Sequence, residues 1–290
     1  MSVCKIADAT DWTLPWFIQT VRDVLHEEPR WHVKLWEWAM LYHGLDALGY
    51  LRENVSAVGL GCGTEPLIFA LANRVKHVIA TDLYSPKSAW FHARLNTEDL
   101  SGTTTIPFPV ERLSVRNMDF ENGYDVPEDS ADLIWSTSSV EHVSSRDALA
   151  ALFMKIARSL KTDGVFAMTT DWYLAGPSCY EPHRIIFDRE TLNMALRDVP
   201  LRLVSALDLR ISSQWENAPC WPGFRSGQLG RPQVTFVLEN GETVFTSVCM
   251  FFKRADGTSA PDIIPPDSTV IEELVYWRDK SRKLASVLDT

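Results

Sequence analysis

The sequence of 290 residues contains no uninterrupted apolar run long enough to cross a membrane. Its first thirty residues carry several charges and no apolar run typical of a secretion signal, so we expect a cytoplasmic protein. The five cysteines, at positions 4, 62, 179, 220 and 249, form no C-x-x-C pair and no metal-ligand spacing. This spacing favours a reduced compartment and predicts no metal site.

Positive charge is also scarce, because 28 lysines and arginines face 38 aspartates and glutamates, for a net charge of −10. Proteins that bind a phosphate backbone need basic surface, so this balance disfavours nucleic acid as a partner. The sequence has no internal repeats and no low-complexity segments. Its hydrophobic content of 46% is enough to bury a large core. We therefore expect a globular enzyme with one core domain and some additional segments.

The most informative segment is a glycine turn that follows an apolar strand. The letters V-G-L-G-C-G-T-E-P occupy residues 58–66, and a second apolar run ends at Asp82. The order of strand, glycine turn, helix, second strand and terminal carboxylate is typical of a doubly wound α/β sheet that binds a nucleoside. The alternative is a glycine turn in an unrelated α/β protein, with Asp82 as a helix cap.

The glycine spacing distinguishes between two kinds of nucleoside cofactor. A dinucleotide fingerprint requires G-x-G-x-x-G, but Thr64 or Pro66 stands where the last glycine would be. A pyrophosphate binds to bare amides at a helix start, and Glu65 would place a carboxylate beside it. S-adenosylmethionine carries an ammonium and a sulfonium and has no phosphate. Spacing and charge together therefore favour S-adenosylmethionine.

Residues from about 55 to 170 resemble the class I S-adenosylmethionine-dependent methyltransferases, in particular those that act on small molecules. Besides the glycine turn, the resemblance rests on N-M-D at 117–119, on D-L-I-W-S-T-S-S-V-E-H-V at 132–143 and on L-K-T-D-G-V-F-A-M-T-T at 160–170. It implies a Rossmann-like, mostly parallel sheet of seven strands with an antiparallel last strand. The family usually has an acidic residue where this chain has Gly59. That carboxylate helps to hold the methionine amino group, and we hypothesise that Glu65 replaces it.

The resemblance and the residue chemistry together predict a cofactor site for S-adenosylmethionine. Its members come from the glycine turn, from the end of the second strand and from the segments around the third and fourth strands: Gly59, Gly61, Cys62, Gly63, Glu65, Asp82, Leu83, Met118, Asp119, Ser136 and Thr137. We interpret Cys62 as a small residue that fits the turn and not as a nucleophile.

Methyl transfer to a hydroxyl or an ammonium requires a general base, and two residues are candidates. His142 follows the predicted fourth strand, and imidazole titrates near neutrality. The alternative is that His142 is a structural residue at a helix start, hydrogen-bonded to the backbone. Asp171 is expected at the end of the fifth strand, and its alternative is a helix cap. We interpret Glu141 as a structural or cofactor-side carboxylate. The sequence requires no metal, although Glu141 and Asp171 could hold Mg²⁺.

Substrate contacts are expected in the loop after the fifth strand. Trp172, Tyr180 and His183 supply aromatic and hydrogen-bonding groups there. Eleven tryptophans is a high number, and Trp12 and Trp16 are candidates for a lid over the cofactor. Core packing is the alternative for both.

Periodicity and turn residues predict the elements of the chain. Helices are expected at 31–48, 66–74, 86–96, 146–161 and 268–288, and strands near 55–60, 77–82, 112–117, 131–137, 164–170, 201–212, 234–238 and 244–253. We divide the chain into an N-terminal helical cap (1–52), a methyltransferase domain (53–255) with a loop or lid insertion at 213–243, and a linker with a C-terminal helix (256–290). The last helix has one apolar edge, so it either docks on its own domain or forms a homodimer.

The predicted function is transfer of a methyl group from S-adenosylmethionine to a hydroxyl, or less favourably an amine, of a small-molecule or sugar-containing metabolite. One alternative is a partner subunit that binds S-adenosylmethionine but does not catalyse methyl transfer. The missing carboxylate at Gly59 would then reflect the loss of catalysis. The other is an NAD-dependent oxidoreductase, which the broken glycine spacing disfavours. Fold and cofactor motif do not identify the methyl acceptor.

Overall fold

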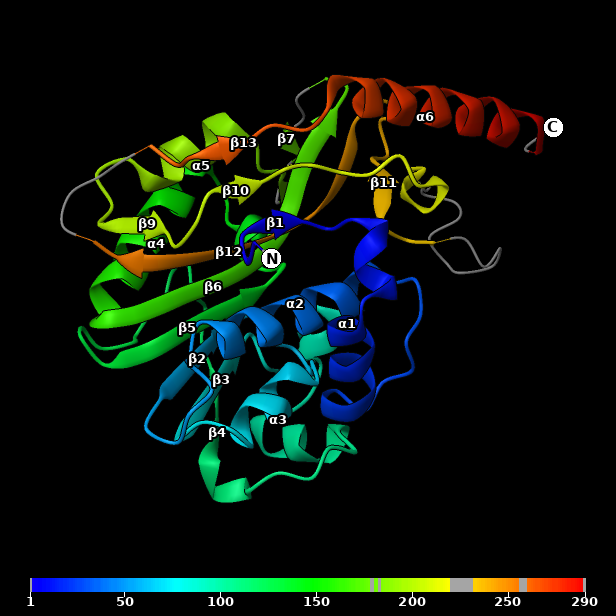
Figure 1. Cartoon of the computed structure of the whole chain (residues 1–290). Coiled ribbons are helices and arrows are strands. Elements are labelled where there is room, and N and C mark those ends of the chain that lie inside the picture. The colour runs from blue at the N-terminus through cyan, green and yellow to red at the C-terminus, as the bar shows by residue number, and fades with distance from the viewer. Residues whose placement is uncertain (1, 178–179, 182–183, 220–231, 256–259, 289–290) are drawn as a thin grey trace.

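The computed structural model of the chain describes residues 2–177, 180–181, 184–219, 232–255 and 260–288. A twisted mixed sheet runs through the centre (Figure 1), with α4 and α5 grouped on one side and α1, α2 and α3 on the other. The helices are α1 (Pro15–Gln19), α2 (Val33–Ala47), α3 (Leu67–Ala72), α4 (Arg146–Ser159), α5 (Arg189–Leu196) and α6 (Ser268–Leu288). No helix in the described ranges is long and apolar enough to span a bilayer.

The centre of the sheet is parallel and confirms the doubly wound α/β fold. Its strands are β2 (Ser56–Leu60), β3 (His77–Asp82), β4 (Leu113–Asn117), β5 (Ala131–Thr137) and β6 (Leu160–Ala175), in the order β6-β5-β2-β3-β4. β2 and β5 are almost entirely buried, as expected for strands covered on both faces. The last long strand, β12 (Val244–Arg254), pairs antiparallel with β6, as predicted.

The sheet continues beyond β12, so it has eleven strands and not seven. The additional strands are β1 (Lys5–Ile6), β9 (Leu201–Leu203), β10 (Leu207–Asp208), β11 (Thr235–Val237) and β13 (Ile263–Ile264). β1 lies between β12 and β10, which brings the N-terminus into the sheet. The strand predicted at 201–212 is therefore two short strands, β9 and β10. A short two-stranded pair, β7 (Tyr180–Glu181) with β8 (Arg184–Ile185), lies apart from this sheet.

The helix predicted at 86–96 is absent from the structure, where only short 3₁₀ turns occur at Phe91–Ala93 and Thr97–Thr103. The Ser85 hydroxyl accepts a hydrogen bond from the Lys87 amide at 3.2 Å, and the Ser88 hydroxyl accepts one from the Trp90 amide at 3.3 Å. Such local side-chain bonds compete with the helical backbone pattern. The prediction was wrong because Pro86 was interpreted as a helix start, while the serines around it favour turns.

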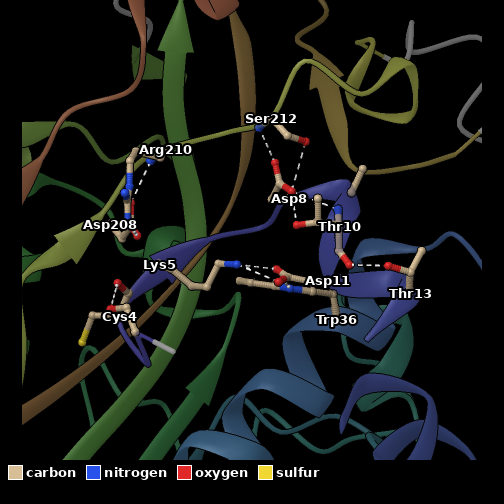
Figure 2. A network of polar contacts seen from close by, with 12 residues as sticks. Cys4, Lys5, Asp8, Thr10, Asp11, Thr13, Trp36, Asp208, Arg210 and Ser212 are labelled. Atoms are coloured by element: carbon tan, nitrogen blue, oxygen red, sulfur yellow. Dashed lines mark hydrogen bonds and ion pairs between the residues drawn. The ribbon is translucent and has the colours of Figure 1, made fainter. Parts of the chain in front are cut away.

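A buried polar network ties the N-terminal segment to the start of α2 (Figure 2). The Lys5 ammonium donates to both oxygens of Asp11 at 2.7 and 2.8 Å, and the Trp36 indole N–H donates to Asp11 at 2.8 Å. Asp8 accepts from the amide and the hydroxyl of Ser212, next to β10. The network therefore fixes α2 against the sheet, and α2 supplies side chains to the site described below.

The long C-terminal helix α6 extends from the body along one edge (Figure 1). Leu274 is buried, whereas Tyr276 and Trp277 are exposed. The helix has the predicted bounds, and its role in docking or self-association stays a prediction.

Candidate functional site

A cavity of about 880 Å³ lies at the carboxyl ends of the parallel strands. One side is lined by the glycine turn after β2, by the end of β3 and by the segments that follow β4 and β5. The cavity is also lined by most of the residues between 30 and 38, which include the start of α2, and by side chains from β6, β8 and β12. Ligands of open α/β sheets bind at this position.

The glycine turn has a conformation that requires its glycines. Gly61 and Gly63 have φ angles of +67° and +52°, in the left-handed region, and a Cβ on Gly61 would lie 2.5 Å from the Ser139 side chain. Asp82 holds the turn in place, because its carboxylate accepts from the Gly63 amide at 2.7 Å and from the Leu83 amide at 2.6 Å. Burial raises the pKa of Asp82, and these two amides oppose the shift. The predicted strand-end carboxylate thus lies beside the cavity.

Gly59 lies outside the cavity, and its missing side chain has a packing reason. Gly59 is the register partner of Trp135 on the neighbouring strand β5. A Cβ on Gly59 would overlap the Trp135 ring and the Cys62 sulfur. Ser136 also lies outside the cavity, because its hydroxyl donates to the Leu60 carbonyl at 2.9 Å within the sheet. Neither residue is placed to contact a cofactor through its side chain.

Glu65 is a buried carboxyl on the cavity wall, at the end of the glycine turn. One of its oxygens accepts from the Trp135 indole N–H at 2.9 Å, and the other accepts from the Trp38 indole N–H at 3.1 Å. Only 8% of the residue is exposed, and burial raises its pKa to about 7 against these hydrogen bonds. The Trp135 ring therefore fills the place of a side chain at position 59 and also orients Glu65.

Other predicted cofactor residues also line the cavity. They are Cys62, Leu83, Met118, Asp119 and Thr137. Burial raises the pKa of the Cys62 thiol well above its usual value, which agrees with a packing role. Asp119 accepts hydrogen bonds from the amides of Glu121 and Asn122 at 2.9 and 3.1 Å, so it closes the turn after β4. Hydrogen bonds from Asn122 lower the pKa of Asp119 and keep it ionised.

Two ion pairs line the cavity. The Lys34 ammonium contacts Glu37 at 2.8 Å, one turn apart on α2, and Glu37 also accepts from the Ser247 hydroxyl. The Arg184 guanidinium contacts one oxygen of Asp171 through Nε at 2.8 Å and through a terminal nitrogen at 2.5 Å. Asp171 is not at the end of its strand, because β6 continues to Ala175. The long antiparallel pairing with β12 extends the strand past the predicted end.

Glu141 and His142 occupy the short turn after β5 (Val140–His142) and both line the cavity. Glu141 is 2% exposed, and among the described residues its Oε2 has no hydrogen-bond partner. Burial and the nearby Asp171 raise the pKa of Glu141 to about 8, and Lys34 opposes the shift. His142 is half-buried and packs against the ring of Trp90, with 4.7 Å between the ring centroids.

Several predicted contacts lie elsewhere. Trp12 is buried in the core, where it stacks on Trp31 at 5.5 Å, and Trp16 stacks on His43; neither lines the cavity. Trp172 follows Asp171 on β6 and points to the opposite face, because side chains alternate along a strand. His183 and the side chain of Tyr180 lie outside the described residues.

Sequence reasoning missed the contribution of α2 and β12 to this cavity. The missed residues are Lys34, Glu37, Trp38, Arg184, Phe245 and Ser247. The sequence did contain a signal for α2, because the spacing of residues 34, 37 and 38 puts their side chains on one face of a helix. Within the described part of the chain, no group of three or more histidine, cysteine, aspartate or glutamate residues is placed to hold a metal ion.

Comparison with known proteins agrees with the fold and with the position of the glycine turn. Residues 58–168 match the family model described as a methyltransferase domain. A candidate sarcosine dimethylglycine methyltransferase from Galdieria sulphuraria is 16% identical, with 79% of this chain and 87% of that chain covered and a TM-score of 0.51. This likeness shows the fold. Comparison with curated proteins gives no match.

Two further solved structures are similar at lower TM-scores. One is a chain of the complex between the Haloferax volcanii Trm112 methyltransferase activator and a candidate methyltransferase, at 16% identity, 83% and 95% coverage and a TM-score of 0.49. The other is an S-adenosylmethionine-dependent methyltransferase from Mesorhizobium loti, at 18% identity, 73% and 97% coverage and a TM-score of 0.45.

Proposed function

We propose that this chain, whose residues 58–168 match the methyltransferase-domain family model, is an S-adenosylmethionine-dependent methyltransferase that transfers a methyl group to a hydroxyl or an amine of a small molecule. The observation that carries the proposal is one continuous cavity that joins the glycine turn to a cluster of buried ionisable side chains. The two ends provide separate places for the cofactor and for the acceptor. A net charge of −10 supports a small-molecule acceptor over a nucleic acid.

The residues of the glycine-turn end fit S-adenosylmethionine. Gly61 and Gly63 line the cavity, and a Cβ on them would lie 2.5 Å from Ser139 and 2.9 Å from His92, so only glycine fits at these positions. Glu65 offers a buried carboxylate to the cationic methionine end, in place of the carboxylate that Gly59 lacks. Asp82 lies at the end of β3, where a carboxylate can accept from ribose hydroxyls, and Met118 and Asp119, which line the cavity after β4, would hold the adenine.

The cofactor supplies an activated methyl on a sulfonium, and the chain supplies position, enclosure and proton transfer. In-line attack requires the acceptor atom to be held close to the methyl carbon, and positioning of this kind contributes much of the rate. The aromatic rings of Trp38, Phe236 and Phe245 line the cavity and keep water from its walls. A carboxyl or imidazole at the acceptor end can take the acceptor proton.

Isothermal titration with S-adenosylmethionine and with NAD tests the cofactor part of the proposal. We expect binding of S-adenosylmethionine and none of NAD; NAD binding alone would overturn the proposal. Transfer of a radiolabelled methyl group to a panel of small hydroxyl and amine acceptors tests the activity. Cofactor binding with no transfer across the panel, together with a stable complex with another protein, would identify a silent partner subunit instead.

Asp171 and His142 remain candidates for the base within this proposal. Turnover of His142→Ala and Asp171→Asn tests them, with cofactor affinity measured in parallel. If both variants keep full turnover with cofactor bound, neither residue is the base.

A further inference from the structure

The charges at the acceptor end of the cavity are not all balanced. Lys34 pairs with Glu37, and Arg184 pairs with Asp171. Glu141 lies beside both pairs: burial and Asp171 raise its pKa, Lys34 lowers it, and Glu37 raises it slightly. At this end of the described cavity, Glu141 is thus the carboxyl that has no paired cation.

The surroundings of Glu141 make this unpaired carboxyl significant. Only 2% of the surface of Glu141 is exposed, and its Oε2 has no hydrogen-bond partner among the described residues. A buried carboxylate without a counter-ion is unfavourable by several kcal/mol in general, so the group either stays protonated or is paired with a cation that also donates hydrogen bonds. The neighbouring His142 packs against Trp90, and it lines the cavity beside Glu141.

An ammonium group completes this site better than a hydroxyl does. An ammonium brings both a positive charge and several N–H donors, so it can bond to Glu141 and compensate its charge. Where Glu141 is ionised, above a pH of about 8, a neutral hydroxyl offers one donor and leaves three carboxylates, Glu37, Glu141 and Asp171, facing two cations. The aromatic ring of Phe245 already has the Arg184 guanidinium 4.8 Å from its centroid, so this end of the cavity accommodates cations beside aromatic faces.

We infer that the methyl acceptor is an amine whose ammonium group binds at Glu141 and gives a proton to that carboxyl before it attacks. The inference rests on the proposed function and narrows it to nitrogen methylation. Sequence reasoning favoured oxygen and interpreted Glu141 as structural, because an isolated carboxylate in a turn shows nothing of the charges packed around it.

The proton and electron balance of this step is complete. The ammonium N–H bond breaks, its proton goes to a Glu141 carboxylate oxygen, and the freed nitrogen lone pair forms the new N–C bond. The S–C bond breaks, and its electron pair stays on sulfur, which becomes neutral. The product amine carries the positive charge that the sulfonium had, and the Glu141 proton later leaves to solvent. No further reactant is needed.

The raised pKa of Glu141 suits this role. A glutamate of ordinary pKa, about 4.3, would take a proton from an alkylammonium of pKa about 10.4 with a penalty of about a millionfold. The raised pKa of Glu141 in the empty site, about 8, reduces this penalty to a few hundredfold at best, because a bound ammonium lowers the pKa of the carboxyl again. The buried environment that leaves Glu141 unpaired therefore also makes it a usable base.

Binding of benzylamine and benzyl alcohol, two probes of nearly equal shape, tests the inference without a known acceptor. Both are titrated by calorimetry into the protein saturated with S-adenosylhomocysteine, at pH 8.5 and pH 6.5. We expect the amine to bind about tenfold or more tightly than the alcohol at pH 8.5, because a charge-assisted hydrogen bond replaces a neutral one. The preference decreases at pH 6.5, where Glu141 holds its proton.

The variant Glu141→Gln has nearly the same shape and cannot ionise. We expect it to bind the two probes within about twofold of each other and to keep the wild-type affinity for S-adenosylhomocysteine. Glu190→Gln on α5, an exposed residue with 73% of its side chain accessible, is the matched control and keeps the amine preference. Equal binding of the two probes by the wild type, tighter binding of the alcohol, or an amine preference that survives in Glu141→Gln would overturn the inference. Failure to bind S-adenosylhomocysteine would instead count against the proposed function.

Discussion

Glu65 predicts that S-adenosylmethionine binding depends on pH. Burial raises the pKa of this carboxyl to about 7, so the protein without cofactor holds a proton there at pH 6. A cation within about 4–6 Å favours the ionised form of a carboxyl. If the cofactor's ammonium binds at Glu65, binding below pH 7 must release this proton. The affinity then decreases as the pH falls through 7.

The size of the effect follows from the two pKa values. If the bound ammonium returns the pKa of Glu65 to its ordinary value of 4.5, proton linkage makes the Kd about 20-fold larger at pH 5.5 than at pH 7.5. This ratio corresponds to about 1.8 kcal/mol. Glu65→Gln cannot ionise, so we expect its Kd to lack this dependence. Its affinity at pH 7.5 is expected to be about tenfold weaker than that of the wild type, because a charge-assisted hydrogen bond is lost.

Calorimetry at several pH values, in two buffers of different ionisation enthalpy, measures both the Kd and the number of protons released. Subtracting the Glu65→Gln titration removes contributions from other groups, such as Asp82, whose pKa burial also raises. Glu53→Gln, with 83% of its side chain exposed, is a control that should match the wild type. A wild-type Kd that changes less than about twofold between pH 5.5 and 7.5 would refute the reasoning, as would an unchanged slope in Glu65→Gln.

Three further predictions concern stability. Because the folded-state pKa of Glu65 lies above its unfolded value, its stabilising contribution is present below pH 4.5 and lost as the pH rises through 7. In urea unfolding, the stability of Glu65→Gln relative to the wild type should therefore increase by about 2.5 kcal/mol from pH 5 to pH 8. Gly59→Asp should lose about 1–3 kcal/mol in the same assay because its Cβ overlaps Trp135, and adding Trp135→Leu should recover part of the loss. Lys5→Met should lose about 3–5 kcal/mol, because it leaves Asp11 buried without its cation, and unchanged unfolding would contradict the importance of this pair.

The parallel centre of the sheet could be predicted because its signals are local. The apolar run that became β2 is followed by a glycine, the run of β3 ends at a carboxylate, and the run of β5 ends at serine and threonine, so each boundary is marked by a residue type. The two-residue strand β1 has no periodicity, because alternation needs several residues to be visible. It exists because the long strand β12 offers a free edge to residues more than two hundred positions away. Sequence reasoning could not anticipate that pairing.

The candidate site could be predicted on the side of the glycine turn and only in part on the other. Glu65 was identified from charge at a fixed offset from the glycines, and the structure places it on the cavity wall. Gly59 was expected to contact cofactor because its position in the motif was known, while its packing against Trp135 was not visible. Asp171 was expected at a strand end, since nothing local shows that β12 extends β6 to Ala175. Contacts that depend on two distant segments leave no signal in either segment alone.

Helix α2 connects the two ends of the cavity. Lys34 and Glu37 belong to the acceptor end, and Trp38, on the same face, donates to Glu65 at the glycine-turn end. The start of this helix is in turn held by the Trp36 and Asp11 contact with the N-terminal segment. A movement of α2 would therefore shift the Trp38 indole, which donates to Glu65, and the Lys34 ammonium together, because a helix moves as a rigid element. The N-terminal region is thus part of the wall of the site, and the geometry of both ends depends on the same buried network around Asp11.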